Sequence, residues 1–480
     1  MNTECIDCCD SSDASVNGYD LIVVGAGSAG FSAAITAAEQ GAQVVLIGEG
    51  TIGGTCVNVG CVPSKTMIRA AETLHQAGAA SRFDGIRSEA AITDWKALVR
   101  QKEALVSQLR QAKYADLLPA YNNVAYLEGR ATVAAGGVVV DGNLIKAGRI
   151  VIATGSSPSV PDIEGIEDVP YLTSTTALEL ETLPKSMTVI GGGYIGCELA
   201  QMFARAGVEV TIVFRSRLLP EAEPEISDAL IDYFTRENIT VIGGVTYKHV
   251  SRKGARVALD LVRAGNDDTV ITDALLVTSG RHANTDGLGL KEAGVELSPH
   301  GGIEIDDRMR TTASGIYAAG DVTGRDQFVY MAAYGAKLAA RNALNGNSER
   351  YDNKAMPAVV FTDPQVASVG LTEAQARQQG IDAKTSLIQL EHVPRALAAR
   401  DTRGLIKLVA DRSTDHLIGA HILAPEGADS IQTAAIAIQQ GMTVQALGDM
   451  IFPYLTTVEG LKLAAQTFDK DVTMLSCCAG

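Results

Sequence analysis

The sequence predicts an α/β protein with two Rossmann-like dinucleotide-binding domains and a C-terminal α+β domain. The prediction of two dinucleotide-binding domains rests on a repeat in the sequence. An apolar strand, a glycine-rich loop, a helix and a second strand occur twice, and in both copies the closing glycine falls 16 residues after the first. A single loop of this kind is a weak signal, but a repeat at one spacing is a strong one. From Met356 onward, short strands alternate with helices without another such loop, which predicts the third domain.

The glycine loops follow the apolar runs 21–24 and 187–190. They contain Gly25, Gly27 and Gly30 in the first copy and Gly191, Gly193 and Gly196 in the second. Glycine lets the backbone approach a pyrophosphate, which lies at the positive end of the following helix. Two tight turns without a ligand would give the same pattern, but the matched pair favours two nucleotides with electron transfer between them.

Charged residues beyond the second strand of each copy indicate which nucleotide binds. Glu49 is the acid nearest the usual ribose-binding position of the first copy, whereas the second copy has Arg215 and Arg217 there. Arginine at this place favours the 2′-phosphate of NADPH, unless the two side chains are solvated surface charges. Asp321 ends a further strand, where it can bind a ligand hydroxyl or cap a helix.

The turns of the chain predict where its domains begin and end. The first nucleotide-binding segment closes with a strand and turn that include Thr154 and Gly155. We expect this domain to comprise residues 19–155 and 281–350, with the second nucleotide-binding domain at 156–280. Residues 351–480 form the expected third domain, and residues 1–18 an expected flexible tail that contains cysteines.

Composition excludes several partners and predicts a location. The net charge of −16 disfavours nucleic acid and anionic membrane surfaces, which select clustered Lys and Arg. The sequence has neither a cleavable signal pattern nor an apolar run of about 18 residues. We therefore expect a cytoplasmic protein, in which most of the eight cysteines are redox-active or metal-binding rather than structural.

Two cysteine pairs point to redox and soft-metal chemistry. Cys56 and Cys61 have the spacing of a reversible disulfide, whereas Cys477 and Cys478 are adjacent and too close for an unstrained one. The adjacent pair is better suited to binding a soft metal ion. Cys197 is expected to be a buried apolar residue. Near the N-terminus, a metal-collecting group and an incidental tail are both open interpretations of Cys5, Cys8 and Cys9.

The stretch Gly53–Lys65, the paired glycine loops and the C-terminal region together resemble the flavin-dependent pyridine nucleotide–disulfide oxidoreductases of the glutathione reductase group. The resemblance implies FAD, NADPH and a homodimer formed through the C-terminal domain. It implies a redox disulfide between Cys56 and Cys61, an ion pair between Lys65 and Glu198 beside the flavin and nicotinamide, and a mobile ring at Tyr194. The residues implied to bind FAD are Gly25, Gly27, Gly30, Glu49, Gly54, Thr55, Lys65, Thr154, Gly155 and Asp321. Those implied to bind NADPH are Gly191, Gly193, Gly196, Arg215 and Arg217.

Two departures from the family pattern bear on cofactor and substrate. The family usually has its ribose-binding glutamate where this chain has Gly48, so the acid is shifted to Glu49. Disulfide-reducing members have His-Pro-Thr-x-x-Glu near the C-terminus, whereas this chain has Tyr454 in place of the histidine and keeps Glu459. A tyrosine, with an ordinary pKa near 10, is a poor proton donor and acceptor for a substrate thiol at neutral pH.

Tyr454 and the C-terminal cysteines together resemble the mercuric reductases of this family. That resemblance implies transfer of thiol-bound Hg(II) from Cys477 and Cys478 of one subunit to Cys56 and Cys61 of the other, followed by NADPH-dependent reduction to volatile Hg(0). Tyr454 would contact the exchanging sulfur or the metal. The N-terminal heavy-metal-binding domain that many members carry has no counterpart in this sequence. The alternatives are a reductase of small disulfides and a non-catalytic scavenger of soft metals.

Overall fold

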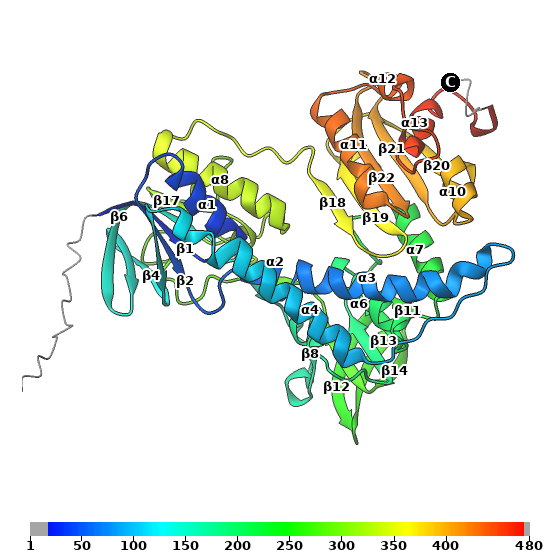
Figure 1. The fold of residues 1–480 in the computed structure, drawn as a ribbon, viewed down its shortest axis with the longest axis horizontal. Coiled ribbons are helices and arrows are strands. Elements are labelled where there is room, and N and C mark those ends of the chain that lie inside the picture. The colour runs from blue at the N-terminus through cyan, green and yellow to red at the C-terminus, as the bar shows by residue number, and fades with distance from the viewer. Residues whose placement is uncertain (1–17, 475–480) are drawn as a thin grey trace, which may run out of the picture. The chain divides into compact units, whose positions relative to one another are not determined.

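The computed structural model describes residues 18–474 (Figure 1). These residues form two compact units. Unit 1 comprises residues 18–52, Tyr114–Gly155 and Ala283–Tyr351, and unit 2 comprises Gly53–Lys113, Ser156–His282 and residues 352–474. The predictions for the tail 1–18, its three cysteines and the pair Cys477 and Cys478 therefore fall almost wholly outside the described residues. The three-domain division stays a prediction.

Unit 1 is built on a mixed sheet in the order β3-β2-β1-β6-β5-β4, with β17 also paired to β6. The strands β1, β2, β3, β6 and β17 run parallel, whereas β4 and β5 are antiparallel. The elements are β1 (Tyr19–Val24), α1 (Ser28–Ala38), β2 (Val44–Gly48), β3 (Val124–Glu128), β4 (Ala131–Ala134), β5 (Gly137–Val140), β6 (Asn143–Ile152), β17 (Ile316–Ala318) and α8 (Val329–Asn345).

The core of unit 1 explains its continuous apolar strands. Leu21–Val24 and Val44–Ile47 are buried on both faces because helices cover one side of the parallel strands and the antiparallel hairpin the other. Alanine dominates the buried side of α1, which lets α1 pack closely against α8. This packing fixes the turn between β1 and α1, where the first glycine loop lies.

The middle of unit 2 is the second βαβ repeat, whose parallel sheet has the order β11-β10-β9-β15-β8. An antiparallel sheet, β12-β13-β14, and the pair β16-β7 complete this part. The elements are β7 (Ser156–Pro158), β8 (Leu172–Thr173), α5 (Ser174–Ala177), β9 (Ser186–Ile190), α6 (Tyr194–Arg205), β10 (Glu209–Phe214), α7 (Pro224–Arg236), β11 (Thr240–Gly243), β12 (Val245–Lys253), β13 (Arg256–Arg263), β14 (Asn266–Thr272), β15 (Ala274–Val277) and β16 (Arg281–Ala283).

The C-terminal part of unit 2 is an antiparallel sheet in the order β18-β19-β22-β21-β20, covered by helices. This agrees with the expected α+β texture. The elements are β18 (Pro357–Val360), β19 (Gln365–Gly370), α9 (Glu373–Gln378), β20 (Ala383–Gln389), α10 (Pro394–Ala399), β21 (Leu405–Asp411), β22 (Leu417–Ala424), α11 (Gly427–Gln439), α12 (Val444–Asp449) and α13 (Glu459–Gln466).

Three further helices of unit 2 precede its βαβ repeat, and the first two of them carry the cysteine pair. They are α2 (Gly54–Asn58), α3 (Cys61–Gly78) and α4 (Trp95–Arg110). The long helix α3 packs against both α6 and α4, and in Figure 1 it runs beside α6. Short turns of 3₁₀ helix lie at Ala79–Arg82, Leu118–Ala120, Ile166–Asp168, Asp321–Thr323, Leu390–His392 and Val472–Met474, and a π turn at Gln111–Ala115. Within residues 18–474, no helix is both long and apolar enough to cross a bilayer.

Candidate redox site and nucleotide loops

The cysteine pair lies where two helices of unit 2 meet. Cys56 is on the short helix α2, and Cys61 is the first residue of α3. Gly53, which precedes α2, and Gly54, its first residue, have φ of 101° and 67°, a left-handed conformation that glycine adopts without strain and that turns the chain into the helix. Both thiols are reduced and partly buried, and they are hydrogen-bonded to each other.

The two thiols have opposite acidities. The pKa of Cys61 falls to about 7, first because the Cys56 thiol donates a hydrogen bond to it and further because the Lys65 ammonium lies nearby. The pKa of Cys56 is raised, chiefly because its proton is held by Cys61 and also by burial. Cys61 is thus the thiolate near neutral pH, and its place at a helix N-terminus favours the same charge.

The predicted ion pair beside the thiols is formed. Lys65 lies one turn along α3 from Cys61, and its Nζ is 2.7 Å from Oε2 of Glu198 on α6. Glu198 is buried, and its second oxygen, Oε1, accepts a hydrogen bond of 2.9 Å from the backbone N–H of Phe361. The Phe361 ring lies 5.0 Å from Lys65 Nζ, within the range of a cation–π contact. Phe361 could not be singled out from the sequence, because its hydrogen bond to Glu198 is made by the backbone.

Replacing Lys65 by methionine is expected to raise the pKa of Cys61, because the Lys65 charge lowers it. Replacing Glu198 by glutamine is expected to lower that pKa, because the carboxylate raises it. The rate of Cys61 alkylation against pH, followed by mass spectrometry of the reduced protein, measures both shifts. Shifts of the same sign in the two variants would contradict this electrostatic account.

The second glycine loop has the form required for a nucleotide phosphate. Gly193 precedes α6 without any side-chain cap, and a Cβ placed on it would meet open space. A Cβ on Gly191 would lie 2.6 Å from the Thr278 carbonyl oxygen, and one on Gly196 would lie 2.0 Å from the Gly191 oxygen. These two glycines let strand and helix pack closely, while Gly193 leaves room above the helix N-terminus. The residues therefore fit NADPH.

Tyr194 is the first residue of α6 and is more than half buried. Burial raises the pKa of its hydroxyl, so the side chain is neutral at physiological pH. Its position at the edge of the glycine loop is compatible with a ring that moves when nicotinamide enters. That movement stays a prediction.

The two arginines predicted to bind the 2′-phosphate have different surroundings. Arg217 donates hydrogen bonds of 2.7 and 2.6 Å to the carbonyl oxygens of Pro220 and Ala222, so its guanidinium already supports the loop that precedes α7. Arg215 is exposed just beyond the end of β10. Burial raises the pKa of the Tyr247 hydroxyl to about 12, and the Arg215 charge acts in the opposite direction on that pKa. We propose Arg215 as the main contact of the phosphate.

Replacing Arg215 by alanine is therefore expected to raise the KM for NADPH about tenfold while leaving the KM for NADH within about twofold, because a lost charged contact costs about 1.5 kcal/mol or more. Replacing Arg217 by alanine is expected to lower thermal stability and to weaken the binding of NADPH and NADH equally. Steady-state kinetics with both nucleotides separate the two roles. If the KM rose selectively for NADPH in the Arg217 variant and not in the Arg215 variant, Arg217 would be the phosphate contact instead of Arg215.

The first glycine loop, in unit 1, fits FAD in the same way. A Cβ on Gly25, whose φ is 114°, would lie 2.3 Å from the Ala153 oxygen, and one on Gly30 would lie 1.7 Å from the Gly25 oxygen. Gly27 precedes α1 and provides no side-chain cap, and no acid lies in the first turn of that helix. The amides at this helix end are thus available to a pyrophosphate.

Three further predicted FAD residues follow strands of the same unit. Thr154 donates a hydrogen bond of 2.7 Å from its hydroxyl to the Asn284 carbonyl, which closes the turn after β6. Gly155 follows with φ of 72°. Asp321 follows β17 and begins a short 3₁₀ turn. Asp321 lies at the carboxyl end of a parallel strand, which is where ligands of such sheets bind. Its role stays a prediction.

The departure at Gly48 has a structural reason. A Cβ on Gly48 would lie 2.7 Å from the Ala26 Cβ and 2.8 Å from the Tyr126 hydroxyl, so the Tyr126 side chain, on β3, fills the space that a larger residue would need. Glu49 lies just beyond the strand end and is exposed. The sequence did not point to Tyr126, because the pairing of β2 with β3 brings it to this place.

The structure thus brings several predicted residues together and leaves others apart. In unit 2, Cys56, Cys61, Lys65 and Glu198 form one electrostatically coupled group. Gly54 and Thr55 lie on α2 with Cys56. The glycines of the first loop, Gly25, Gly27 and Gly30, belong to unit 1. Tyr454 lies in the turn before α13, about half exposed, while Glu459 begins that helix, is buried and accepts a hydrogen bond from the Leu455 N–H.

Two glycine loops on βαβ units and a pair of coupled thiols define a nucleotide-dependent redox enzyme. The chain belongs to the pyridine nucleotide-disulphide oxidoreductase family, whose model matches residues 19–340 and whose dimerisation domain matches residues 356–465. A mercuric reductase from Lysinibacillus sphaericus is 47% identical over 464 residues, covering 96% of this chain and 85% of that protein. One from Streptomyces lividans is 48% identical over 469 residues, covering 96% and 99%.

A solved structure gives the same fold. The Cu(II) complex of the HOCl-induced flavoprotein disulfide reductase RclA from Escherichia coli matches with a TM-score of 0.83 and 31% identity, covering 94% of this chain and 99% of that one. The predicted fold class and both stated resemblances are therefore confirmed. FAD and NADPH are the cofactors that follow from the family and its relatives.

Proposed function

We propose that the protein is an NADPH-dependent flavoenzyme that reduces thiol-bound Hg(II) to Hg(0). The observation that carries the proposal is the Cys56–Cys61 pair, in which one thiol is a thiolate near neutral pH and the other keeps its proton. The similarity to mercuric reductases over 96% of the chain supports the choice of substrate. Tyr454, where disulfide-reducing members have histidine, supports it independently.

The thiols of this pair have the chemistry that a soft cation requires. Hg(II) prefers two thiolate ligands, so it moves only when a new thiolate replaces a bound one. Cys61 can attack first as a thiolate, and Cys56 follows once its proton leaves with the displaced thiol. Lys65 balances the negative charge that accumulates, and Glu198 keeps Lys65 in place. Bound FAD supplies two electrons from NADPH, which convert Hg(II) into Hg(0), a species with little affinity for thiolates.

The proposal includes a homodimer in which each active site uses residues of both subunits. The dimerisation domain supports the dimer itself. An apolar patch formed by Met450, Ile451, Tyr454 and Leu455 is exposed in this domain, and Ile451 is 98% exposed. A patch of this kind usually lies in an interface. We propose that Tyr454 and the cysteines Cys477 and Cys478 reach the other subunit's pair from there, and that the enzyme acts in the cytosol.

Replacing both Cys477 and Cys478 by alanine is expected to slow Hg(II) turnover at least about tenfold when the metal is supplied as a dithiol complex, because no second thiolate pair remains to displace the ligand. Reduction of the flavin by NADPH is expected to stay within about twofold of the wild type. Steady-state turnover and anaerobic flavin reduction measure the two steps separately. Unchanged turnover with the dithiol complex would remove these cysteines from the transfer path.

The proposed function is tested by mixing the FAD-loaded protein with NADPH and thiol-bound Hg(II). We expect NADPH oxidation that depends on Hg(II) and is not supported by small organic disulfides. Oxidation with disulfides but not with Hg(II) would favour the disulfide reductase that the similarity to RclA suggests. A protein without bound flavin would favour a metal scavenger.

A further inference from the structure

Phe361 contacts both members of the Lys65–Glu198 pair and belongs to neither of the elements that carry them. Its backbone N–H donates to Glu198 Oε1 at 2.9 Å, and its ring lies 5.0 Å from Lys65 Nζ. Since Oε2 of Glu198 accepts from Lys65 at 2.7 Å, both oxygens of the buried carboxylate are bonded. Phe361 thus contacts the carboxylate through its backbone and the ammonium through its ring.

The segment that contains Phe361 is not held by a strand ladder. It runs between the end of β18 at Val360 and the start of β19 at Gln365. Gln201 holds this segment from α6. Its Oε1 accepts from the Asp363 N–H at 2.8 Å, and its Nε2 donates to the Asp363 carbonyl at 2.8 Å. Gln201 is 3% exposed and lies one turn along α6 from Glu198, on the same face.

We propose that Phe361 is a positioning residue for the Lys65–Glu198 pair, and that Gln201 acts through Asp363 to hold Phe361 in place. The inference rests on the proposed function, in which this pair lies beside the flavin and nicotinamide. It assigns a role to the C-terminal part of the chain in hydride transfer from NADPH, in addition to dimerisation. The Gln201 side chain bonds to the Asp363 backbone and to Glu237, and we infer that its effect on the Lys65–Glu198 pair passes through the backbone of residues 361–363.

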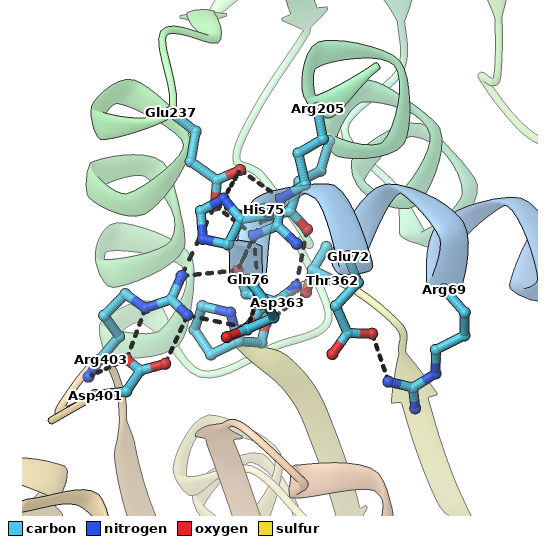
Figure 2. Close-up of polar contacts among 12 residues, drawn as sticks. Arg69, Glu72, His75, Gln76, Arg205, Glu237, Thr362, Asp363, Asp401 and Arg403 are labelled. Carbon is cyan, nitrogen blue, oxygen red and sulfur yellow. Dashed lines mark hydrogen bonds and ion pairs between the residues drawn. The ribbon is translucent and has the colours of Figure 1, made fainter. Parts of the chain in front are cut away.

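Two arginines hold the Asp363 side chain from two further sides (Figure 2). Arg205 of α6 lies 3.0 Å from Oδ2, and Arg403 lies 3.1 Å from Oδ1. Both arginines also pair with Glu237, which follows α7, and Arg403 pairs with Asp401 at 2.8 Å. Removing either arginine would take from Asp363 and Glu237 one of their two arginine partners, at a cost in stability. Gln201 is neutral. Its Nε2 also donates to Glu237 Oε1 at 3.0 Å, but Glu237 keeps both hydrogen bonds from Arg205 when Gln201 is replaced. The replacement therefore tests the backbone contact without removing a charge.

A second buried junction in unit 2 provides a matched control. Lys407 of β21 pairs with Glu223 at 3.0 Å and with Glu225 at 2.8 Å, and Glu223 also accepts from the Glu373 N–H at 2.7 Å. Glu223 is 2% exposed, as buried as Gln201. It joins the same two parts of unit 2, but within residues 18–474 it has no hydrogen bond or ion pair with Phe361 or Glu198. Glu223→Gln therefore weakens the junction without affecting the segment 361–363.

The test uses the FAD-loaded protein and two measurements on the wild type, Gln201→Met and Glu223→Gln. Amide hydrogen exchange of residues 357–365 reports whether the segment is held. Rapid mixing with NADPH, without any mercury, gives the limiting rate of flavin reduction and the Kd for NADPH. In Gln201→Met we expect faster exchange and a limiting rate reduced about tenfold, because a small displacement of a positioned group has effects of this size. The Kd should stay within about twofold.

In Glu223→Gln we expect exchange of residues 357–365 and the rate of flavin reduction to match the wild type, even if the melting temperature falls. Equal rate losses in both variants, or an unchanged rate in Gln201→Met, would overturn the inference. Phe361→Leu serves if Gln201→Met does not fold, because it keeps the N–H and removes the ring. It should slow flavin reduction at an unchanged Kd, and a wild-type rate would overturn the role of the ring. Failure of the wild type to reduce Hg(II) would overturn the proposed function alone.

Discussion

Replacing Cys61 by serine is expected to abolish NADPH-dependent Hg(II) reduction, with a loss of more than about a thousandfold. The thiol is the thiolate of the pair, with a pKa of about 7, whereas a serine hydroxyl stays protonated and is a poor ligand for a soft cation. Flavin content is expected to stay unchanged, because the FAD glycine loop is in unit 1. Hg(II)-dependent oxidation of NADPH, normalised to bound flavin, measures the loss.

Cys197→Ala is the control for this prediction. Cys197 is fully buried on α6, and burial raises the pKa of its thiol, so it is unreactive at neutral pH. We expect this variant to lose about 1 kcal/mol of stability and to keep its activity per flavin within about twofold. A Cys61→Ser enzyme that retained a tenth or more of wild-type turnover would exclude Cys61 from the reaction.

Replacing Arg403 by methionine is expected to lower the free energy of unfolding by about 2–3 kcal/mol, because charged hydrogen bonds to Asp363 and Asp401 are lost while Arg205 and Arg82 remain as partners of these carboxylates. Arg403 lies between Asp363 and Asp401 and also near Glu237, and all three carboxylates are at most 12% exposed (Figure 2). These carboxylates come from three separate segments, so the loss should appear as one cooperative destabilisation of unit 2. Urea unfolding of the FAD-loaded protein, followed by circular dichroism, measures it.

Arg412→Met is the matched control for Arg403→Met. Arg412 pairs with Asp382 at 3.2 Å, but both side chains are more than half exposed. An exposed pair contributes at most about 1 kcal/mol. A loss in the Arg403 variant no larger than that in the Arg412 variant would show that the network in Figure 2 is not a main source of stability.

Much of the fold could be predicted because its signals are local. The glycine loops follow buried strands at Val24 and Ile190, and the close contacts of Gly25 and Gly191 show why no other residue fits there. Division into compact units could not be predicted in the same way. Residues 53–113 lie between two segments of unit 1 in sequence, yet they pack with α6 in unit 2. The assignment of this segment to unit 2 depends on contacts between helix surfaces that are distant in the sequence.

In the candidate site, too, some residues could be predicted from the sequence and others could not. Cys56, Cys61, Lys65 and Glu198 have side chains that perform chemistry, so their types and spacing were informative. Phe361 could not be found because it acts through its backbone N–H, and Gln201 because its partner is the backbone of Asp363. Tyr126 explains Gly48 only through the register of β2 and β3. Contacts made by backbone atoms or across strands leave no motif in a single sequence.

The central claim is that electrons from NADPH reach a mercury ion bound by the Cys56–Cys61 pair. The most direct measurement follows NADPH oxidation and the release of elemental mercury vapour together, with purified FAD-loaded protein and thiol-bound Hg(II). The account predicts one mercury atom released for each NADPH oxidised, and neither process in Cys61→Ser. NADPH oxidation without mercury vapour, or vapour released at the wild-type rate by Cys61→Ser, would contradict it.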